Sequence, residues 1–386
     1  MPEIWLRYGT TDIVLDIRFE NLASHVSSNF PAMPDDQVKE ALAAAVPITD
    51  NSMLLVALSS SRAAAKAISQ IAARAPSVTV DVPARLAGSL RSGLASLFAD
   101  PQAAAAAPPV SINRIDYQSF AERAKKFQST VLVSQAGYDP LFGFAGAPTA
   151  LVRALYPEKM AEAFGARRGN VPEPGIEGAP LEVAREAIEN SLQATTSIEL
   201  VANSAGIAGV HTGTVNGAFV EAVSQLKSIP PAAGAEAEEQ MRSAIISASS
   251  ESGPHATLAS ALNSLWNCVH AVKEGGTAVL LAECREGIGG GALQALVEGR
   301  LKQEQVALSP YVEGLEHLLY IQELRQKREL GIVSSLPNYY ATKLGFSTFA
   351  GVKDAFENML GKHGKGHKSL VVSDADITPI NIKTAG

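Results

Sequence analysis

The stretch 273–291 constrains the fold more than any other part of the sequence, because its pattern fits three consecutive elements of one α/β unit. The pair Gly275-Gly276 is typical of a helix end, since glycine adopts the left-handed conformation that closes a helix. The apolar run 277–282 predicts a strand that is buried on both faces. The glycine-rich segment 287–291 predicts a loop whose backbone approaches another group closely.

This glycine loop is a candidate ligand site. In open α/β sheets, ligands bind outside the carboxyl ends of the strands. Arg285, Gly289 and Gly290 follow the predicted strand and are therefore candidate binding residues. A tight turn that only connects a strand to a helix explains the same glycines equally well.

Strands and helices alternate along the rest of the chain. The apolar segments 52–58, 129–134 and 369–373 are typical of buried strands, and helical patterns lie between them. This alternation predicts parallel sheets with right-handed crossovers. The predicted fold class is α/β, with two α/β domains, mainly parallel sheets and a cleft between the domains.

The domain boundary is expected at the proline- and alanine-rich segment 228–235. Residues 1–230 would form the first domain and residues 231–386 the second. The chain of 386 residues, 46% of them hydrophobic, is long enough for two sizeable cores.

Composition excludes several classes of function. The formal net charge of −7 and the lack of a long basic block argue against a nucleic-acid partner. No run of 18 apolar residues predicts a membrane span, and two cysteines without a CxxC motif fit a reducing compartment. We therefore expect a cytoplasmic protein without a membrane partner.

Two segments are candidate anion sites. Ser59, Ser60, Ser61 and Arg62 lie between a predicted strand and a predicted helix, where free N–H groups suit a carboxylate or phosphate. Simple N-capping by serine is the alternative explanation. The cationic run 362–368 suits phosphate or a metal, although its composition favours a solvated loop.

Three short motifs stand out: Glu-Gly-Gly-Thr at 274–277, Tyr-Gly at 8–9 within a predicted hairpin, and Gly-Phe-Ala-Gly at 143–146. Together they resemble the nickel-pincer lactate racemase family. The resemblance covers most of the chain and implies a lactate racemase-like fold. In that family, one lysine tethers a nickel-binding pincer, one histidine completes the nickel coordination, and two histidines act as acid and base on a hydroxy acid.

The residues that the resemblance assigns to this chemistry are replaced here. Thr149 stands where the tethering lysine is expected, Asp139 replaces a histidine, and no histidine lies between His25 and His211. The resemblance therefore implies a diverged member without these groups, and no cofactor is predicted. The nickel-pincer nucleotide is expected only if the tethering lysine lies elsewhere, for example at Lys159.

Two classes of function fit these observations. The first is a binding or assembly protein, which takes a small carboxylate or hydroxy acid, pairs with a racemase as a subunit, or forms a homo-oligomer. The second is a hydroxy-acid racemase or epimerase type of enzyme with altered cleft chemistry. Asp139 and His255 are the candidate catalytic residues, and no metal ligand is predicted. The candidate ligand-binding residues are Ser59, Ser60, Ser61, Arg62, Tyr138, Thr149, Arg285, Gly289 and Gly290.

Overall fold

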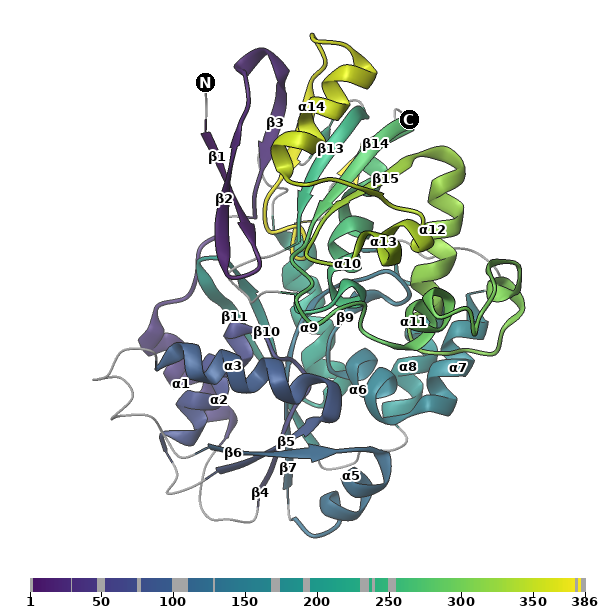
Figure 1. Ribbon diagram of the computed structural model, residues 1–386. Helices are drawn as coiled ribbons and strands as arrows, with labels where there is room; N and C mark the ends of the chain where they lie inside the picture. The colour runs from purple at the N-terminus through teal and green to yellow at the C-terminus, as the bar shows by residue number, and fades with distance from the viewer. Residues whose placement is uncertain are drawn as a thin grey trace.

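Two six-stranded sheets organise the structure, which is a computed structural model (Figure 1). The described residues are 3–28, 30–46, 53–74, 78–98, 110–127, 129–167, 174–189, 195–229, 236–237, 240–248, 255–378 and 381–382. Most of the predicted domain boundary, residues 230–235, lies outside these residues.

The first sheet has the strand order β11-β10-β7-β4-β5-β6, and only its edge strand β11 runs antiparallel to its neighbour. Side chains alternate between its faces, so Leu54 and Val56 belong to one apolar cluster and Leu55 and Ala57 to another. The strands are β4 (Met53–Ala57), β5 (Val78–Pro83), β6 (Val110–Ile115), β7 (Ser129–Gln135), β10 (Thr195–Asn203) and β11 (Gly206–Gly213).

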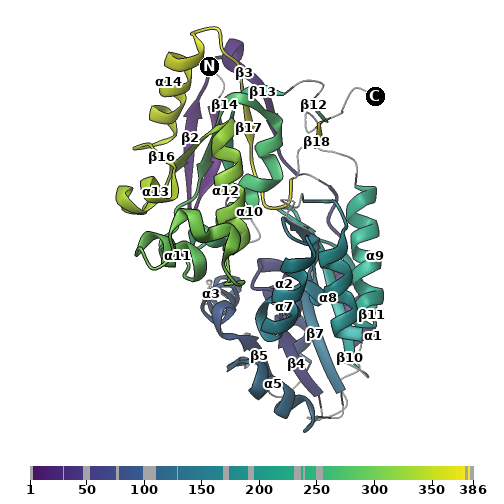
Figure 2. The same cartoon turned by 90° about the vertical axis from the view of Figure 1, so that its right-hand side faces the viewer.

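Helices cover both faces of the first sheet, and α9 lies against β10 and β11 (Figure 2). One face packs against α1 (Asp35–Ala45), α2 (Arg62–Ala72) and α3 (Ala87–Leu97). The other face packs against α5 (Tyr117–Ala124), α6 (Ala147–Leu155), α7 (Pro157–Ala166), α8 (Ala179–Glu189) and α9 (Val215–Ser228).

The second sheet has the order β16-β15-β14-β13-β17-β3, with every neighbouring pair parallel. Its strands are β3 (Leu22–Val26), β13 (Met241–Ser247), β14 (Val272–Leu281), β15 (Glu329–Val333), β16 (Ser347–Thr348) and β17 (Ser369–Val372). The helices of this half are α10 (Leu258–Cys268), α11 (Gly291–Val297), α12 (Leu315–Lys327), α13 (Asn338–Leu344) and α14 (Val352–His363). The short pairs are β8 (Gly137–Asp139) with β9 (Gly143–Ala145), and β12 (Glu236–Ala237) with β18 (Asn381–Ile382).

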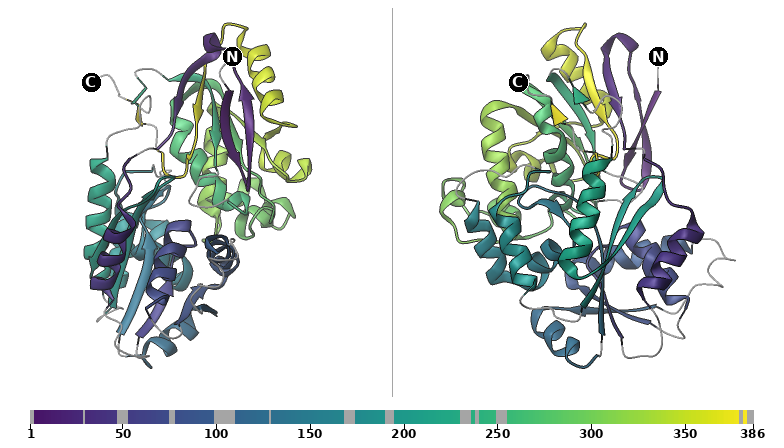
Figure 3. Two further views of the ribbon diagram at one scale, coloured as in Figure 1. Left: turned by 90° about the vertical axis from the view of Figure 1, so that its left-hand side faces the viewer. Right: turned by 180° about the vertical axis from the view of Figure 1, so that it is seen from behind.

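The N-terminal segment packs on the second sheet, although the sequence pattern grouped it with residues 1–230. Strand β3 pairs with β17, and the hairpin of β1 (Glu3–Tyr8) and β2 (Thr11–Asp16) lies beside α14 (Figure 3). Leu6 and Leu15 are buried there against Ile245 and Val279. Such long-range pairing leaves no local pattern in the sequence, and the division of the chain at residue 230 stays a prediction.

The predicted helix end at Gly275-Gly276 is wrong. Helix α10 ends at Cys268, a 3-10 turn continues to Ala271, and both glycines lie inside β14. Gly275 has φ 75°, and the pairing register with β13 shifts at this level. The glycines therefore make an irregularity in a strand. The strand predicted at 277–282 is confirmed as the second half of β14, with its last residue beyond the strand end.

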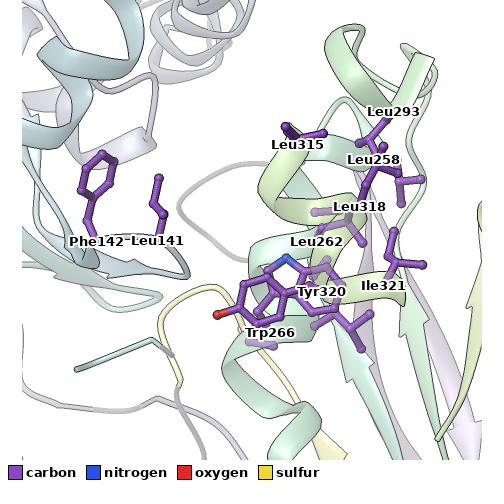
Figure 4. Packing of buried hydrophobic residues seen from close by; sticks show 14 of the residues in the cluster. Leu141, Phe142, Leu258, Leu262, Trp266, Leu293, Leu315, Leu318, Tyr320 and Ile321 are labelled. Carbon is purple, nitrogen blue, oxygen red and sulfur yellow. The ribbon is translucent and has the colours of Figure 1, made fainter. Parts of the chain in front are cut away.

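One apolar cluster spans both halves of the molecule. Leu141 and Phe142 of the first half share it with Leu262, Trp266 and Tyr320 of the second. Figure 4 shows Trp266 and Tyr320 side by side, with the Tyr320 hydroxyl directed towards the segment of Leu141 and Phe142. The predicted α/β fold class with mainly parallel sheets is confirmed, while the cleft stays a prediction. Among the described residues, no helix is long and apolar enough to cross a membrane.

Candidate functional site

A buried cluster of charged side chains joins the two halves. Asp139 at the end of β8 pairs with Arg153 of α6, whose guanidinium also pairs with Glu316 of α12. The Arg153 side chain is 17% exposed, Asp139 7% and Glu316 2%. The guanidinium carbon also lies 5.0 Å from the centre of the Phe142 ring. Two carboxylates and one guanidinium thus meet where water is largely excluded.

Asp139, a predicted catalytic residue, is held by four hydrogen bonds. Its Oδ1 accepts from the main-chain N–H groups of Leu141 at 2.8 Å and Phe142 at 2.9 Å. Arg153 Nη2 donates to both carboxylate oxygens at 3.0 Å. This arrangement closes the turn after β8 and orients Arg153. The catalytic role of Asp139 stays a prediction, and its geometry is that of a positioning group.

Glu316 completes the ion-pair network. Its Oε1 accepts from Arg153 Nη1 at 2.5 Å, while Oε2 is buried without a hydrogen-bond partner among the described residues. Burial favours protonation, but the charge and hydrogen bond of Arg153 outweigh it and hold the pKa of Glu316 below its ordinary value. The two carboxylates in turn raise the pKa of Arg153 despite its burial.

His317 is neutral in this environment. Its Nδ1 accepts the indole N–H of Trp266 at 2.9 Å, so any proton of the neutral ring is on Nε2. Burial lowers the pKa of His317 in spite of the nearby Glu316. The Trp266 ring stacks on Tyr320 at 5.0 Å, and the Tyr320 hydroxyl donates to the Pro140 carbonyl at 3.1 Å. Trp266 thus links the histidine to the packing between the halves.

Sequence reasoning missed Arg153, Glu316 and His317. One signal was available, because Glu316 and His317 interrupt the apolar residues Leu315 and Leu318 at the start of a helix. Two adjacent polar residues on a buried helix face need partners. Their partner Arg153 is distant in sequence, and only the fold identifies it.

The serine segment after β4 caps helix α2. Ser61 is the N-cap residue, and its Oγ accepts the Ala64 N–H at 3.1 Å. Ser59 Oγ accepts the Ser61 N–H at 3.2 Å and donates to Ser61 Oγ at 3.1 Å. Ser60 is half-buried and Arg62 exposed. The structure shows the capping that was the alternative explanation, and an anion at these residues stays a prediction.

The glycine loop 287–291 packs against the start of α10. The carbonyls of Gly287 and Ile288 accept the N–H groups of Leu258 and Ala259, each at 3.0 Å. A Cβ on Gly289, which has φ 103°, would lie 3.0 Å from the Thr257 side chain. The close approach that these glycines permit is therefore to the protein itself. Gly290, with φ 87°, precedes α11, and Arg285 is exposed. A ligand at Arg285, Gly289 and Gly290 stays a prediction.

His255, the second predicted catalytic residue, faces a carboxylate. Its Nε2 lies 3.7 Å from Asp376 Oδ2, with the two side chains 19% and 14% exposed. The same Nε2 has no hydrogen-bond partner among the described residues. No ion pair or hydrogen bond given by the described residues joins His255 to Asp139. The structure therefore places the two catalytic candidates in separate clusters.

The Gly-Phe-Ala-Gly motif leads into helix α6, where Thr149 is 2% exposed. Thr149 Oγ1 accepts the Gly146 N–H and donates to the Gly146 carbonyl, both at 3.1 Å. The Tyr138 ring packs 5.7 Å from the Phe144 ring, and burial raises the pKa of Tyr138. Thr149 and Tyr138 thus contribute to local structure around the motif, and a ligand at these two residues stays a prediction.

Two lysines bear on the expected tether position. Lys159 pairs with Glu162 at 2.7 Å on the exposed side of α7. Lys227 Nζ lies 5.0 Å from the centre of the Phe144 ring and also pairs with Glu177. Neither amine occupies the position of Thr149. Among the described residues, no group of three or more His, Cys, Asp or Glu side chains is arranged to hold a metal ion.

Comparison with known proteins identifies the fold. No family model matches the sequence, and no curated protein matches it significantly. The lactate racemase apoprotein from Thermoanaerobacterium thermosaccharolyticum superposes with a TM-score of 0.69 at 12% identity, covering 99% of this chain and 100% of that one. A protein from Thermotoga maritima superposes with a TM-score of 0.59 at 9% identity, covering 91% and 99%. The chain therefore has a lactate racemase-like fold.

Proposed function

Starting from a fold shared with a lactate racemase, we propose that this protein is a binding or assembly protein that does not carry a tethered nickel pincer. The scaffold would bind a small carboxylate or hydroxy acid, or act as a subunit beside a racemase or a second copy of itself. The likeness to solved structures supports the scaffold alone. The absence of pincer chemistry is argued from the residues of this chain.

The environment of Thr149 carries the proposal. The resemblance assigns this position to a lysine that tethers the cofactor covalently through its amine, and Thr149 offers a hydroxyl instead. Thr149 is also buried, and both hydrogen-bonding functions of its hydroxyl are satisfied by Gly146. The residues present therefore do not fit a tethered pincer.

The charged cluster supports a scaffold with fixed halves. Arg153 links β8 of the first half to α12 of the second through two ion pairs, and apolar packing surrounds it. Groups engaged in this way are not available to exchange protons with a substrate. A rigid two-lobed body suits a protein whose role is to present surfaces to a ligand or partner.

Intact mass and metal analysis test the proposal first. The protein is produced together with the cofactor-building proteins of a true racemase, and that racemase is produced in parallel as the positive control. For this protein we expect an unmodified mass and no stoichiometric nickel. The control racemase should gain both the mass of the covalent adduct and stoichiometric nickel. A covalent adduct on this chain, whether on Lys227, Lys159 or another residue, would contradict the proposal.

Size measurement tests the assembly part. Light scattering of the purified protein, alone and mixed with the racemase, reports whether a defined oligomer or complex forms. A single monomeric species in both samples leaves ligand binding as the only surviving part of the proposal. Titration with lactate and other small 2-hydroxy acids then decides that part, because absence of binding to all of them refutes it.

One observation favours an enzymatic function instead. The His255–Asp376 pair places an imidazole beside a carboxylate, with 3.7 Å between His255 Nε2 and Asp376 Oδ2. Incubation with 2-hydroxy acids in deuterated water tests this alternative. Under the binding proposal we expect no exchange at the α-carbon. Exchange that His255→Gln abolishes would establish the racemase or epimerase type of enzyme.

A further inference from the structure

A cavity of about 400 Å³ lies at the edge of the second sheet where the strands begin. It is formed by the starts of β15 and β16, the early part of β14, and the carboxyl ends of α12, α13 and α14. Ligands of α/β sheets usually bind at the opposite edge, so this cavity is separate from the predicted cleft. Its lining residues are Gly275, Arg325, Lys327, Arg328, Glu329, Leu330, Gly345, Ser347 and Lys362.

Positive charge dominates this cavity. Four cationic side chains line it, and Glu329 is the only carboxylate among the described lining residues. Lys362 Nζ pairs with Glu329 Oε2 at 2.5 Å, and Thr277 and Ser347 donate to the same carboxylate at 3.1 and 3.0 Å. The Glu329 carboxylate is therefore fully engaged, and neither Arg325 nor Arg328 forms an ion pair with it among the described residues.

Arg328 is a buried cation that has no carboxylate partner in an ion pair among the described residues. It is 9% exposed, and its Nε–H donates to the main-chain carbonyl of Val272. Burial lowers its pKa, and the attraction of the more distant Glu274 only partly offsets this. A buried charge without an ion pair is costly unless a ligand supplies the opposite charge.

Arg325 is directed over a glycine. A Cβ on Gly345 would lie 2.2 Å from the guanidinium carbon of Arg325, so the absence of a side chain admits the guanidinium at this place. No ion pair or hydrogen bond of Arg325 is among those of the described residues. Lys327 lies 3.9 Å from Glu274, and both side chains are more than half exposed. Two guanidinium groups and an ammonium thus surround the cavity.

The negative ends of the helix dipoles offset only part of this positive charge. Cations at helix carboxyl ends are ordinary, because each end carries roughly half a negative charge. Four full positive charges exceed the combined negative charge of Glu329, the more exposed Glu274 and the three helix ends, each of which carries roughly half a charge. The positive potential also extends along the strand edge, since Arg242 and Lys273 contribute, after burial and His363, to lowering the pKa of His367 to about 4.

We propose that this cavity binds a small, multiply charged phosphate compound. Guanidinium groups match the geometry of phosphate oxygens, and a volume of about 400 Å³ suits a compact ligand. The described lining residues include no aromatic side chain on which a nucleobase could stack. The ligand class is therefore a polyphosphate or a small phosphorylated metabolite.

Calorimetric titration of the full-length protein with pyrophosphate at constant ionic strength tests the proposal. We expect one binding site per chain and weaker binding of inorganic phosphate. Arg325→Gln should weaken pyrophosphate binding about tenfold, because it removes one charge-assisted interaction. Lys353→Gln is the matched control, since it removes an 86% exposed lysine of α14 that does not line the cavity.

Several outcomes would overturn the proposal. Absence of binding heat refutes the site. If Arg325→Gln and Lys353→Gln weaken pyrophosphate binding equally, the binding is general charge attraction and the specific site is refuted. Citrate that binds as tightly as pyrophosphate refutes the preference for phosphate, and a nucleoside triphosphate that binds far more tightly refutes the compact ligand. Arg325 is exposed, so its variant should fold; Arg328→Lys provides a second variant that keeps the charge but loses the planar donor geometry.

Discussion

At the scale of single residues, Glu199 of β10 is the most perturbed carboxyl of the Gly-Phe-Ala-Gly region. It is fully buried, and its Oε1 accepts the Ala147 N–H at the start of α6 at 2.5 Å. Burial raises its pKa to about 8, against the opposing effect of hydrogen bonds from Ala147 and Ser134. Glu199 is therefore protonated at neutral pH in the folded protein and ionised in the unfolded chain.

The first prediction concerns pH and Glu199. The folded state holds its proton more tightly than the unfolded state, so this residue's contribution to stability is complete below pH 4.5 and falls as pH rises to about 8. The total loss is roughly 5 kcal/mol at about 1.4 kcal/mol per pKa unit. Glu199→Gln should remove this loss, as urea denaturation of both proteins across the pH range will show. Glu182→Gln, at an exposed position on α8, should leave the pH profile unchanged.

At the scale of elements, the glycine loop 287–291 orders the start of two helices. Its carbonyls bind the N–H groups of Leu258 and Ala259 at the start of α10, and Gly291 begins α11. Gly291 has φ 61°, and a Cβ there would lie 2.1 Å from the Glu313 carbonyl oxygen. Both the backbone conformation and the available space require glycine at this position.

The second prediction follows from this geometry. Gly291→Ala should destabilise the fold by about 3 kcal/mol, because a left-handed conformation and a main-chain clash add together. Gly299→Ala is the matched control: Gly299 has φ 78°, but a Cβ added there would have no atom within 4 Å. It should lose only about 1 kcal/mol. Equal unfolding free energies for the two variants in urea would show that the contact with Glu313 is unimportant.

At the scale of the whole molecule, Arg153 holds the halves together by charge. Its guanidinium forms ion pairs with Asp139 of the first half and with Glu316 of the second. Arg85 and Glu313 also connect the halves, at 3.0 Å, but both side chains are well exposed. Exposed ion pairs contribute little because water and salt screen them.

The third prediction compares these two ion pairs. Arg153→Met should cost about 3–5 kcal/mol, because it leaves two buried carboxylates without a partner. Adding Asp139→Asn and Glu316→Gln should recover much of this loss, since the buried charges are removed. Arg85→Met should cost less than about 1 kcal/mol. Chemical denaturation measures all three, and a small effect of Arg153→Met would refute a structural role for the cluster.

The sequence predicted those features that depend on neighbours along the chain. The buried strands of both sheets are recognisable from runs such as 53–57 and 277–281, since strands covered on both faces are continuously apolar. The serines after β4 identified the start of α2, because capping involves residues three apart. The helix end at Gly275-Gly276 was predicted wrongly, because glycine is equally compatible with an irregular strand.

Only the tertiary structure decided which distant residues meet. Strand β3 joins β17 in the second sheet, Asp139 finds Arg153 and Glu316, and Lys362 of the predicted cationic run joins Arg325 and Arg328 around one cavity. The physical reason is that apolar periodicity specifies how each segment is buried, whereas ion pairing, strand order and cavity lining depend on contacts between segments. The sequence alone thus determined the α/β class of the protein, and the folded chain determined where its charges gather.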